Sequence, residues 1–204
     1  MDSSKKHFHT LDALRFFSFL IVFFHHIPVP ENSWFSVFSK SGDVGVSFFF
    51  VLSGFLISYI LIFEKKANKT INLKNFLAKR ILKIWPLFYA MLLFAFLTPF
   101  ILKQLQLSFS NEGYEPNWLL SVLFLENYNM MLTNNFPNVS PLRVMWSLCI
   151  EEHFYIIWGF LFSIIPLNKI KYLIIISIVL ASVCRLFYSY FNLPFLDVFT
   201  NIDY

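Results

Sequence analysis

Long apolar runs that are almost free of charge dominate the pattern of hydrophobic and polar positions. A helix needs about 20 residues to cross the roughly 30 Å hydrocarbon core of a bilayer. Five runs meet or approach this length: 11–27, 44–63, 84–102, 154–166 extended backwards through Trp146, and 172–190. The pattern therefore predicts an all-α integral membrane protein, a multi-span helical bundle with about five spans.

A shorter stretch at 118–132 suits lipid poorly, because it carries polar residues from Glu126 to Asn129. If this stretch crossed the membrane, Lys169 and Lys171 would lie outside, against the tendency of basic residues to stay on the cytoplasmic side. We therefore predict a re-entrant segment that enters from the outer side and is buried in protein.

Basic residues set the expected orientation, because Lys and Arg near span ends favour the cytoplasm. They are Lys5, Lys6 and Arg15 around the first run, and Lys65, Lys66, Lys69, Lys74, Lys79, Arg80 and Lys83 between the second and third. Connections 31–43 and 103–117 are poor in Lys and Arg and are expected outside. The amino terminus is then inside and the carboxyl terminus outside. The odd span count and the absence of a polar tail favour a part of a longer protein.

Composition supports the membrane prediction and excludes other classes. Of the 204 residues, 57% are hydrophobic, 21% aromatic and 14% charged, against roughly a quarter charged in soluble domains. The net charge of +4 is explained by basic residues beside spans, so no nucleic-acid partner is expected. Cys149 and Cys184 lie in apolar runs and do not suggest a disulfide framework. No metal site is expected either, because the adjacent His25 and His26 diverge on a helix.

The first apolar run is unusual because it contains ionisable residues, which in a membrane helix are paired or functional. Asp12 and Arg15 are three residues apart and can pair on one face. Arg15 and His26 are eleven apart, which returns to within about 20° of the same face after a rise of about 16 Å. Two interpretations stay open. The three form a polar stripe in a common cavity, or Arg15 reaches the headgroups and His26 caps the outer end.

Four sequence motifs occur in an order that resembles the membrane acyltransferase 3 family, whose members O-acylate sugars and related acceptors. They are Leu11-Asp12-Ala13-Leu14-Arg15 with His26, residues 45–57 (GVSFFFVLSGFLI), residues 80–89 (RILKIWPLFY) and residues 146–155 (WSLCIEEHFY). The resemblance covers nearly the whole chain. It implies that 1–204 is an acyltransferase 3-like transmembrane domain, incomplete at its carboxyl end.

The resemblance implies an enzyme that moves an acyl group, expected to be acetyl, from acyl-CoA to a hydroxyl of a carbohydrate or other cell-envelope acceptor. Such a protein is expected in the bacterial inner membrane. An imidazole, with an ordinary pKa of about 6.5, can accept a proton at physiological pH, so His26 is the predicted general base. The other predicted catalytic residues are Arg15, Asp12 and Glu152, and the predicted donor-binding residues are Arg15, Lys79, Arg80 and Lys83.

Three positions depart from the family pattern. Ser47 stands where many members have Asp, His153 where Gln is common, and Lys83 where Arg is usual. Lys keeps the charge but loses the bidentate fork for phosphate, so donor affinity is the property most affected. Glu151 and Glu152 could also serve only as helix caps. Two alternative hypotheses stay open. The chain could be a transporter or flippase with a proton relay, or an inactive part of such an acyltransferase.

Overall fold

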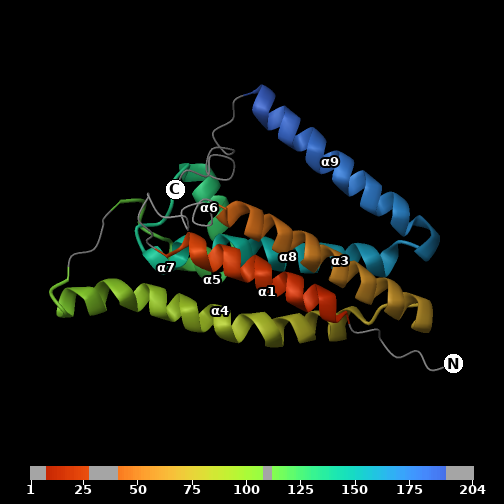
Figure 1. The fold of residues 1–204 in the computed structure, drawn as a ribbon, viewed down its shortest axis with the longest axis horizontal. Coiled ribbons are helices and arrows are strands. Elements are labelled where there is room, and N and C mark those ends of the chain that lie inside the picture. The colour runs from red at the N-terminus through yellow and green to blue at the C-terminus, as the bar shows by residue number, and fades with distance from the viewer. Residues whose placement is uncertain (1–7, 28–40, 108–111, 192–204) are drawn as a thin grey trace. The chain divides into compact units, whose positions relative to one another are not determined.

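The computed structural model describes residues 8–27, 41–107 and 112–191, and within them the chain is helical (Figure 1). The helices are α1 (His9–His25), α3 (Gly42–Asn68), α4 (Leu73–Gln104), α5 (Trp118–Val122), α6 (Glu126–Thr133), α7 (Ser140–Arg143), α8 (Trp146–Ile164), the 3₁₀ turn η1 (Leu167–Lys169) and α9 (Ile170–Tyr190). In the same residues the only β pairing is an isolated bridge between Tyr114 and Pro137. The all-α prediction is confirmed.

Four stretches of the described chain are long and apolar enough to cross a membrane: Gly42–Asn68, Leu73–Gln104, Pro141–Ile164 and Leu167–Tyr190. They coincide with four of the five predicted spans. The first predicted span coincides with α1, which has 17 residues. Lys5, Lys6, the greater part of connection 31–43 and the carboxyl-terminal tail, on which parts of the orientation argument depend, lie outside the described residues.

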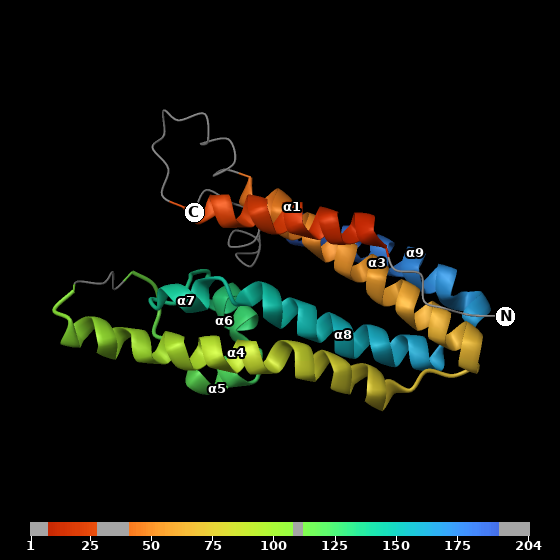
Figure 2. The ribbon, with the colours of Figure 1, turned by 60° about the horizontal axis from the view of Figure 1, so that its bottom comes forward.

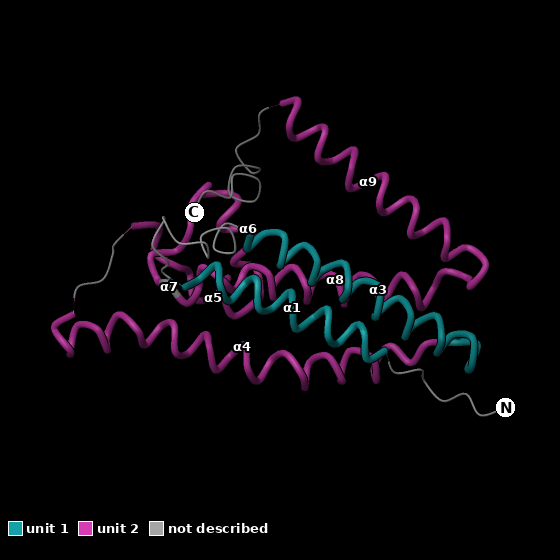
Figure 3. Tube along the Cα trace, viewed as in Figure 1, with its two compact units in different colours: residues 1–70, 203 teal, residues 71–202, 204 magenta. Residues whose placement is uncertain are grey.

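The chain divides into two compact units (Figure 3). Unit 1 comprises residues 1–70 and contains α1 and α3, and unit 2 comprises residues 71–202 and contains the remaining helices. Each unit holds part of the predicted chemistry, since Arg15 and His26 belong to unit 1 and Glu152 belongs to unit 2.

In unit 1, α1 and α3 run side by side in opposite directions (Figure 2). Small residues on α3 allow the close approach, as is common between membrane helices. A Cβ atom placed on Gly45 would lie 2.8 Å from a methyl of Val22 and 3.0 Å from the carbonyl oxygen of Ser18. A Cβ on Gly42 would lie 2.4 Å from the His25 ring. The pair therefore depends on glycine at both positions.

In unit 2, α4 and α8 pack against each other in opposite directions, with α5 and α7 against α4 and α6 against α8 (Figure 2). Near the amino end of α4, a Cβ on Gly159 of α8 would lie 2.8 Å from the Phe76 ring. One apolar core joins α4, the α5–α6 turn, α7 and α8; its members are Phe88, Leu92, Ala95, Phe124, Val139, Leu142, Met145 and Cys149.

The predicted re-entrant stretch 118–132 forms two short helices, α5 and α6, instead of one span. The side chain of Asn117 caps α5 by accepting the N–H of Leu119 at 2.9 Å. Phe124, in the turn between the helices, has a left-handed φ of 59° and is 5% exposed. The stretch is thus broken, and one side of it is buried, with Ser121, Phe124, Glu126, Asn127 and Met130 inside, whereas Trp118, Leu119, Leu123, Tyr128 and Leu132 are exposed. The expected burial in protein is therefore only partial in the described residues, and the depth of the stretch in a membrane stays a prediction.

The antiparallel arrangement of α4 and α8 also bears on orientation. Lys74 and Lys79 lie in the first turns of α4, and Lys169 and Lys171 follow the end of α8. Because the amino end of α4 lies beside the carboxyl end of α8, these lysines gather at one end of unit 2, while α5, α6 and α7 lie towards the other. This grouping supports one basic side, as the positive-inside rule requires.

Candidate active site

Arg15 turns its guanidinium towards α3. Its Nη2 atom donates a 3.4 Å hydrogen bond to Oγ of Ser53, and the guanidinium carbon lies 5.8 Å from the centre of the Phe49 ring. Its Nε atom is buried and has no hydrogen-bond partner among the described residues. The charge is therefore held inside the helix pair with one donor unused, which suits a group that meets a ligand.

The two histidines at the end of α1 have different surroundings. His25 packs against Gly42 of α3 and interacts electrostatically with Asp43. His26 is the C-cap residue, exposed, with its ring centre 5.0 Å from that of His25. On an ideal helix Arg15 and His26 still lie on one flank of α1, so the exposed imidazole is the one that an external hydroxyl can reach. Asp12 lies in the first turn of α1, and its pairing with Arg15 stays a prediction.

Glu152 is the most buried of the predicted catalytic residues, with 3% of its surface exposed. Its Oε1 atom accepts a 3.0 Å hydrogen bond from the indole N–H of Trp85 on α4. Its Oε2 atom is buried without a partner within the described chain. Glu152 lies beyond the first turn of α8 and faces α4, so the structure does not place it as a helix cap. One oxygen of this carboxylate is therefore hydrogen-bonded, and the other can accept a hydrogen bond from a ligand.

The predicted donor-binding cluster divides into exposed and packed members. Lys79 and Lys83 on α4 are exposed. The Arg80 guanidinium lies over two aromatic rings, 5.8 Å from the centre of Phe76 and 5.4 Å from that of Tyr155. Arginine stacked on aromatic faces is held in place by cation–π attraction. The two lysines are therefore the cluster members best placed to meet a dissolved anion, and Arg80 also fastens α4 to α8.

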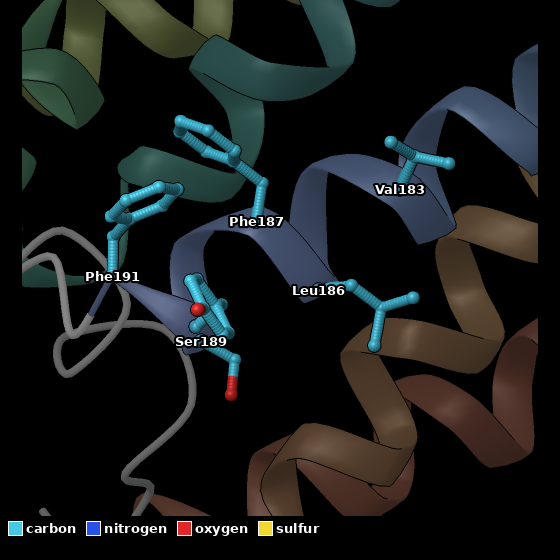
Figure 4. A pocket seen from close by; sticks show the side chains of 6 residues that line it. Val183, Leu186, Phe187, Ser189 and Phe191 are labelled. Atoms are coloured by element: carbon cyan, nitrogen blue, oxygen red, sulfur yellow. The ribbon is translucent and has the colours of Figure 1, made fainter.

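An apolar hollow on α9 contains none of the predicted site residues (Figure 4). It is lined by Val183, Leu186, Phe187, Ser189, Tyr190 and Phe191. Most of these side chains are exposed and apolar, which is expected on a helix that faces lipid or other helices in a membrane.

Comparison with known proteins gives a consistent result. The model of the family described as "Acyltransferase domain" matches residues 8–203. The chain belongs to this acyltransferase family. No solved structure matches it.

Curated relatives of this chain carry related names. The chain is 35% identical over 161 residues to the peptidoglycan O-acetyltransferase OatA of Listeria monocytogenes, covering 76% of this chain and 24% of that protein. It is 32% identical over 153 residues to the putative peptidoglycan O-acetyltransferase YrhL of Bacillus subtilis (72% and 22%). It is 28% identical over 175 residues to the O-acetyltransferase OatA of Staphylococcus aureus (83% and 28%). The chain spans about a quarter of the length of these relatives.

Two contacts of this chain were not predicted from its sequence. The first is that of Ser53, 2% exposed, which accepts the hydrogen bond from Arg15. A small polar residue 38 positions away gives no pairing signal until the two helices are docked. Ser47, which departs from the family pattern, is exposed and lies on another face of α3.

The second missed feature is Glu126 in the re-entrant stretch. Its carboxylate is 1% exposed and accepts short hydrogen bonds from the hydroxyls of Tyr114 and Ser121. Burial, together with the hydrogen bond to Glu126, raises the pKa of the Tyr114 phenol, so this hydroxyl keeps its proton and donates. An acidic residue inside an otherwise apolar stretch was the available signal.

Proposed function

We propose that this protein is a membrane-embedded O-acyltransferase that moves an acyl group, in the first instance acetyl, from acyl-CoA to a hydroxyl of a cell-envelope glycan. The observation that carries the proposal is the family match over residues 8–203. The names of the relatives, peptidoglycan O-acetyltransferases, favour a glycan acceptor and an acetyl donor. A bacterial inner membrane is where such a donor and acceptor meet.

His26 acts as the general base in this proposal. Its imidazole takes the proton of the acceptor hydroxyl as the oxygen attacks the thioester carbonyl. The new C–O ester bond forms, the C–S bond breaks, and CoA leaves as the thiolate, which then takes up a proton. The exposed position of His26 at the end of α1 supports this role, because the acceptor is a large glycan.

Arg15 and the α4 lysines supply positive charge for the donor. The unused Nε–H of Arg15 and its Ser53-bound Nη2 form a fixed group that can hold a phosphate of the donor, about 16 Å along α1 from His26. Lys79 and Lys83, exposed on α4, meet the nucleotide phosphates as point charges. Asp12 orients Arg15 from one turn earlier in α1.

Glu152 contributes the second polar centre. The Trp85 hydrogen bond holds Oε1 in place, which leaves Oε2 to accept a proton or a hydrogen bond from a reacting group. A buried carboxylate oxygen without a hydrogen-bond partner lowers the stability of the folded protein, and such groups are candidates for a functional role.

The test uses inverted membrane vesicles that contain the full-length protein, with soluble peptidoglycan fragments enclosed at the outer face and acetyl-CoA added at the cytoplasmic face. We expect free CoA thiol to appear only when both are present. Replacing His26 with Ala should lower the rate by a factor of about 10² to 10⁴. His9→Ala, at the exposed other end of α1, is the matched control and should leave the rate unchanged. Glycan movement across the membrane without CoA release would favour a flippase, and full activity in the His26 variant would remove the general base.

A further inference from the structure

A buried polar cluster in unit 2 is left unused by the proposed chemistry. Glu126 uses both carboxylate oxygens, Oε1 for the hydroxyl of Tyr114 and Oε2 for that of Ser121. Ser121 is 1% exposed, as is Glu126. A buried carboxylate that accepts two hydroxyl donors makes charge-assisted hydrogen bonds, which are stronger than neutral ones. These three residues, called the latch below, therefore tie the loop before α5 to α5 and α6.

The loop that supplies Tyr114 is itself fixed by backbone pairing. The N–H of Tyr114 donates to the carbonyl of Phe136 at 3.1 Å, and the N–H of Asn138 donates to the carbonyl of Tyr114 at 2.9 Å. Arg143 adds a 3.0 Å hydrogen bond from Nε to the carbonyl of Pro137. The phenol is thus presented to the carboxylate from a loop that is paired with residues 136–138, and the latch connects this loop with α5 and α6.

Phe124 connects the latch to the candidate site. It lies two residues before Glu126, and its ring centre is 3.9 Å from that of Phe88 and 5.7 Å from that of Trp85. Trp85 in turn donates its indole N–H to Glu152. A shift of the α5–α6 turn would move the aromatic surface against which the indole rests, because close-packed rings transmit displacement.

We propose that Glu126 is a positioning residue: through Tyr114 and Ser121 it latches the α5–α6 segment, and the segment holds the Trp85 indole on Glu152. The inference rests on the proposed function for its activity readout. A positioning role differs from a purely structural one because loss of the latch should lower activity only by disturbing the hydrogen bond between Trp85 and Glu152.

A double-mutant cycle measures that path. Glu126→Leu keeps a similar volume but leaves the hydroxyls of the latch without an acceptor, and Trp85→Phe removes the indole N–H. In the vesicle assay we expect each single variant to lower kcat for CoA release about tenfold, with KM for acetyl-CoA unchanged. The double variant should be no slower than either single variant. Glu115→Leu, an exposed glutamate of the same loop, is the matched control and should keep full activity.

A second readout does not depend on activity. Cys149 is 0% exposed, and it lies on α8, against which α6 with Glu126 packs. In a Cys184→Ser background, Cys149 should resist a membrane-permeant maleimide in the unmodified protein and react several times faster in Glu126→Leu. If the Glu126→Leu protein does not insert into the membrane, the milder double variant Tyr114→Phe with Ser121→Ala takes its place. It should show smaller changes in the same direction in kcat and in the rate of Cys149 labelling.

The outcomes separate the two proposals. If the unmodified protein releases no CoA, the proposed function fails, while Cys149 protection still tests the latch. If CoA is released but the cycle is additive, with a loss of about a hundredfold in the double variant, Glu126 does not act through Trp85 and the inference is overturned. Unchanged Cys149 protection in Glu126→Leu overturns the latch itself.

Discussion

Two buried carboxylates in unit 2 differ in how well they are satisfied. Glu126 uses both oxygens on hydroxyl donors, whereas Glu152 uses one oxygen on Trp85 and keeps the other buried without a partner among the described residues. Both are at most 3% exposed. A satisfied polar group stabilises one conformation, and an unsatisfied one is costly unless a ligand or a proton completes it. We propose on this ground that Glu126 serves packing and Glu152 serves the chemistry.

In this comparison the largest expected effect is the loss of activity on substitution of Glu152, the carboxylate with an unpartnered oxygen. Glu152→Gln keeps an oxygen for the Trp85 N–H but replaces Oε2 by an amide that donates instead of accepting. We expect CoA release to fall about 100-fold, while the free energy of unfolding changes by only about 1 kcal/mol. The vesicle assay and thermal unfolding in detergent measure the two effects. A variant that is fully active but much less stable would reverse the assignment of the two carboxylates.

A substitution in the loop that carries Tyr114, the partner of Glu126, should lower the free energy of unfolding. Gly113 has φ of 112°, and a Cβ there would lie 2.3 Å from the carbonyl oxygen of Phe136. Gly113→Ala should therefore lower the free energy of unfolding by about 1–3 kcal/mol and lower the unfolding temperature. Gly54→Ala in α3, at a helical position, provides the comparison. An unfolding temperature equal to that of the unmodified protein would show that the loop does not support the latch.

The smallest expected effect concerns pH. Because burial and Glu126 raise the pKa of Tyr114 above its ordinary value, its hydrogen bond is fully present below the unfolded value of about 10 and is lost as pH rises through the folded value. The difference in unfolding temperature between the unmodified protein and Tyr114→Phe should stay constant from about pH 6 to pH 9. It should shrink only above about pH 10. A change within the neutral range would mean that another group controls the latch.

The sequence predicts the helices well because membrane spans are defined by length and apolarity alone. The apolar run 44–63 lies within α3, and the helix continues to Asn68 because charged residues are tolerated beyond the hydrocarbon. The polar residues of 118–132 indicated that it is not an ordinary span, but the break between its two helices falls at the apolar residues 123–125 and was not predicted. The spans themselves are local features, so they can be inferred without knowing which helices meet.

The contacts of the candidate site could be predicted only in part. Helical spacing places Arg15 and His26 on one flank of α1, but it does not show that Ser53 would receive Arg15 or that His25 would pack on Gly42. Glu126 and Tyr114 are joined by a chain reversal within a loop, which no periodicity reports. Such pairings depend on docking between segments and on side-chain rotamers, which the order of residue types does not encode directly.

The central claim is acyl transfer from CoA to a glycan hydroxyl, and isotopic labelling tests it most directly. Inverted vesicles that contain the full-length protein and enclose soluble peptidoglycan fragments would receive acetyl-CoA labelled in the acetyl group, and both free CoA and label in alkali-sensitive glycan esters would be counted. We expect one labelled ester for each CoA released, with both lost in His26→Ala. Release of CoA without label in the glycan, or label transfer that survives the His26 substitution, would contradict it.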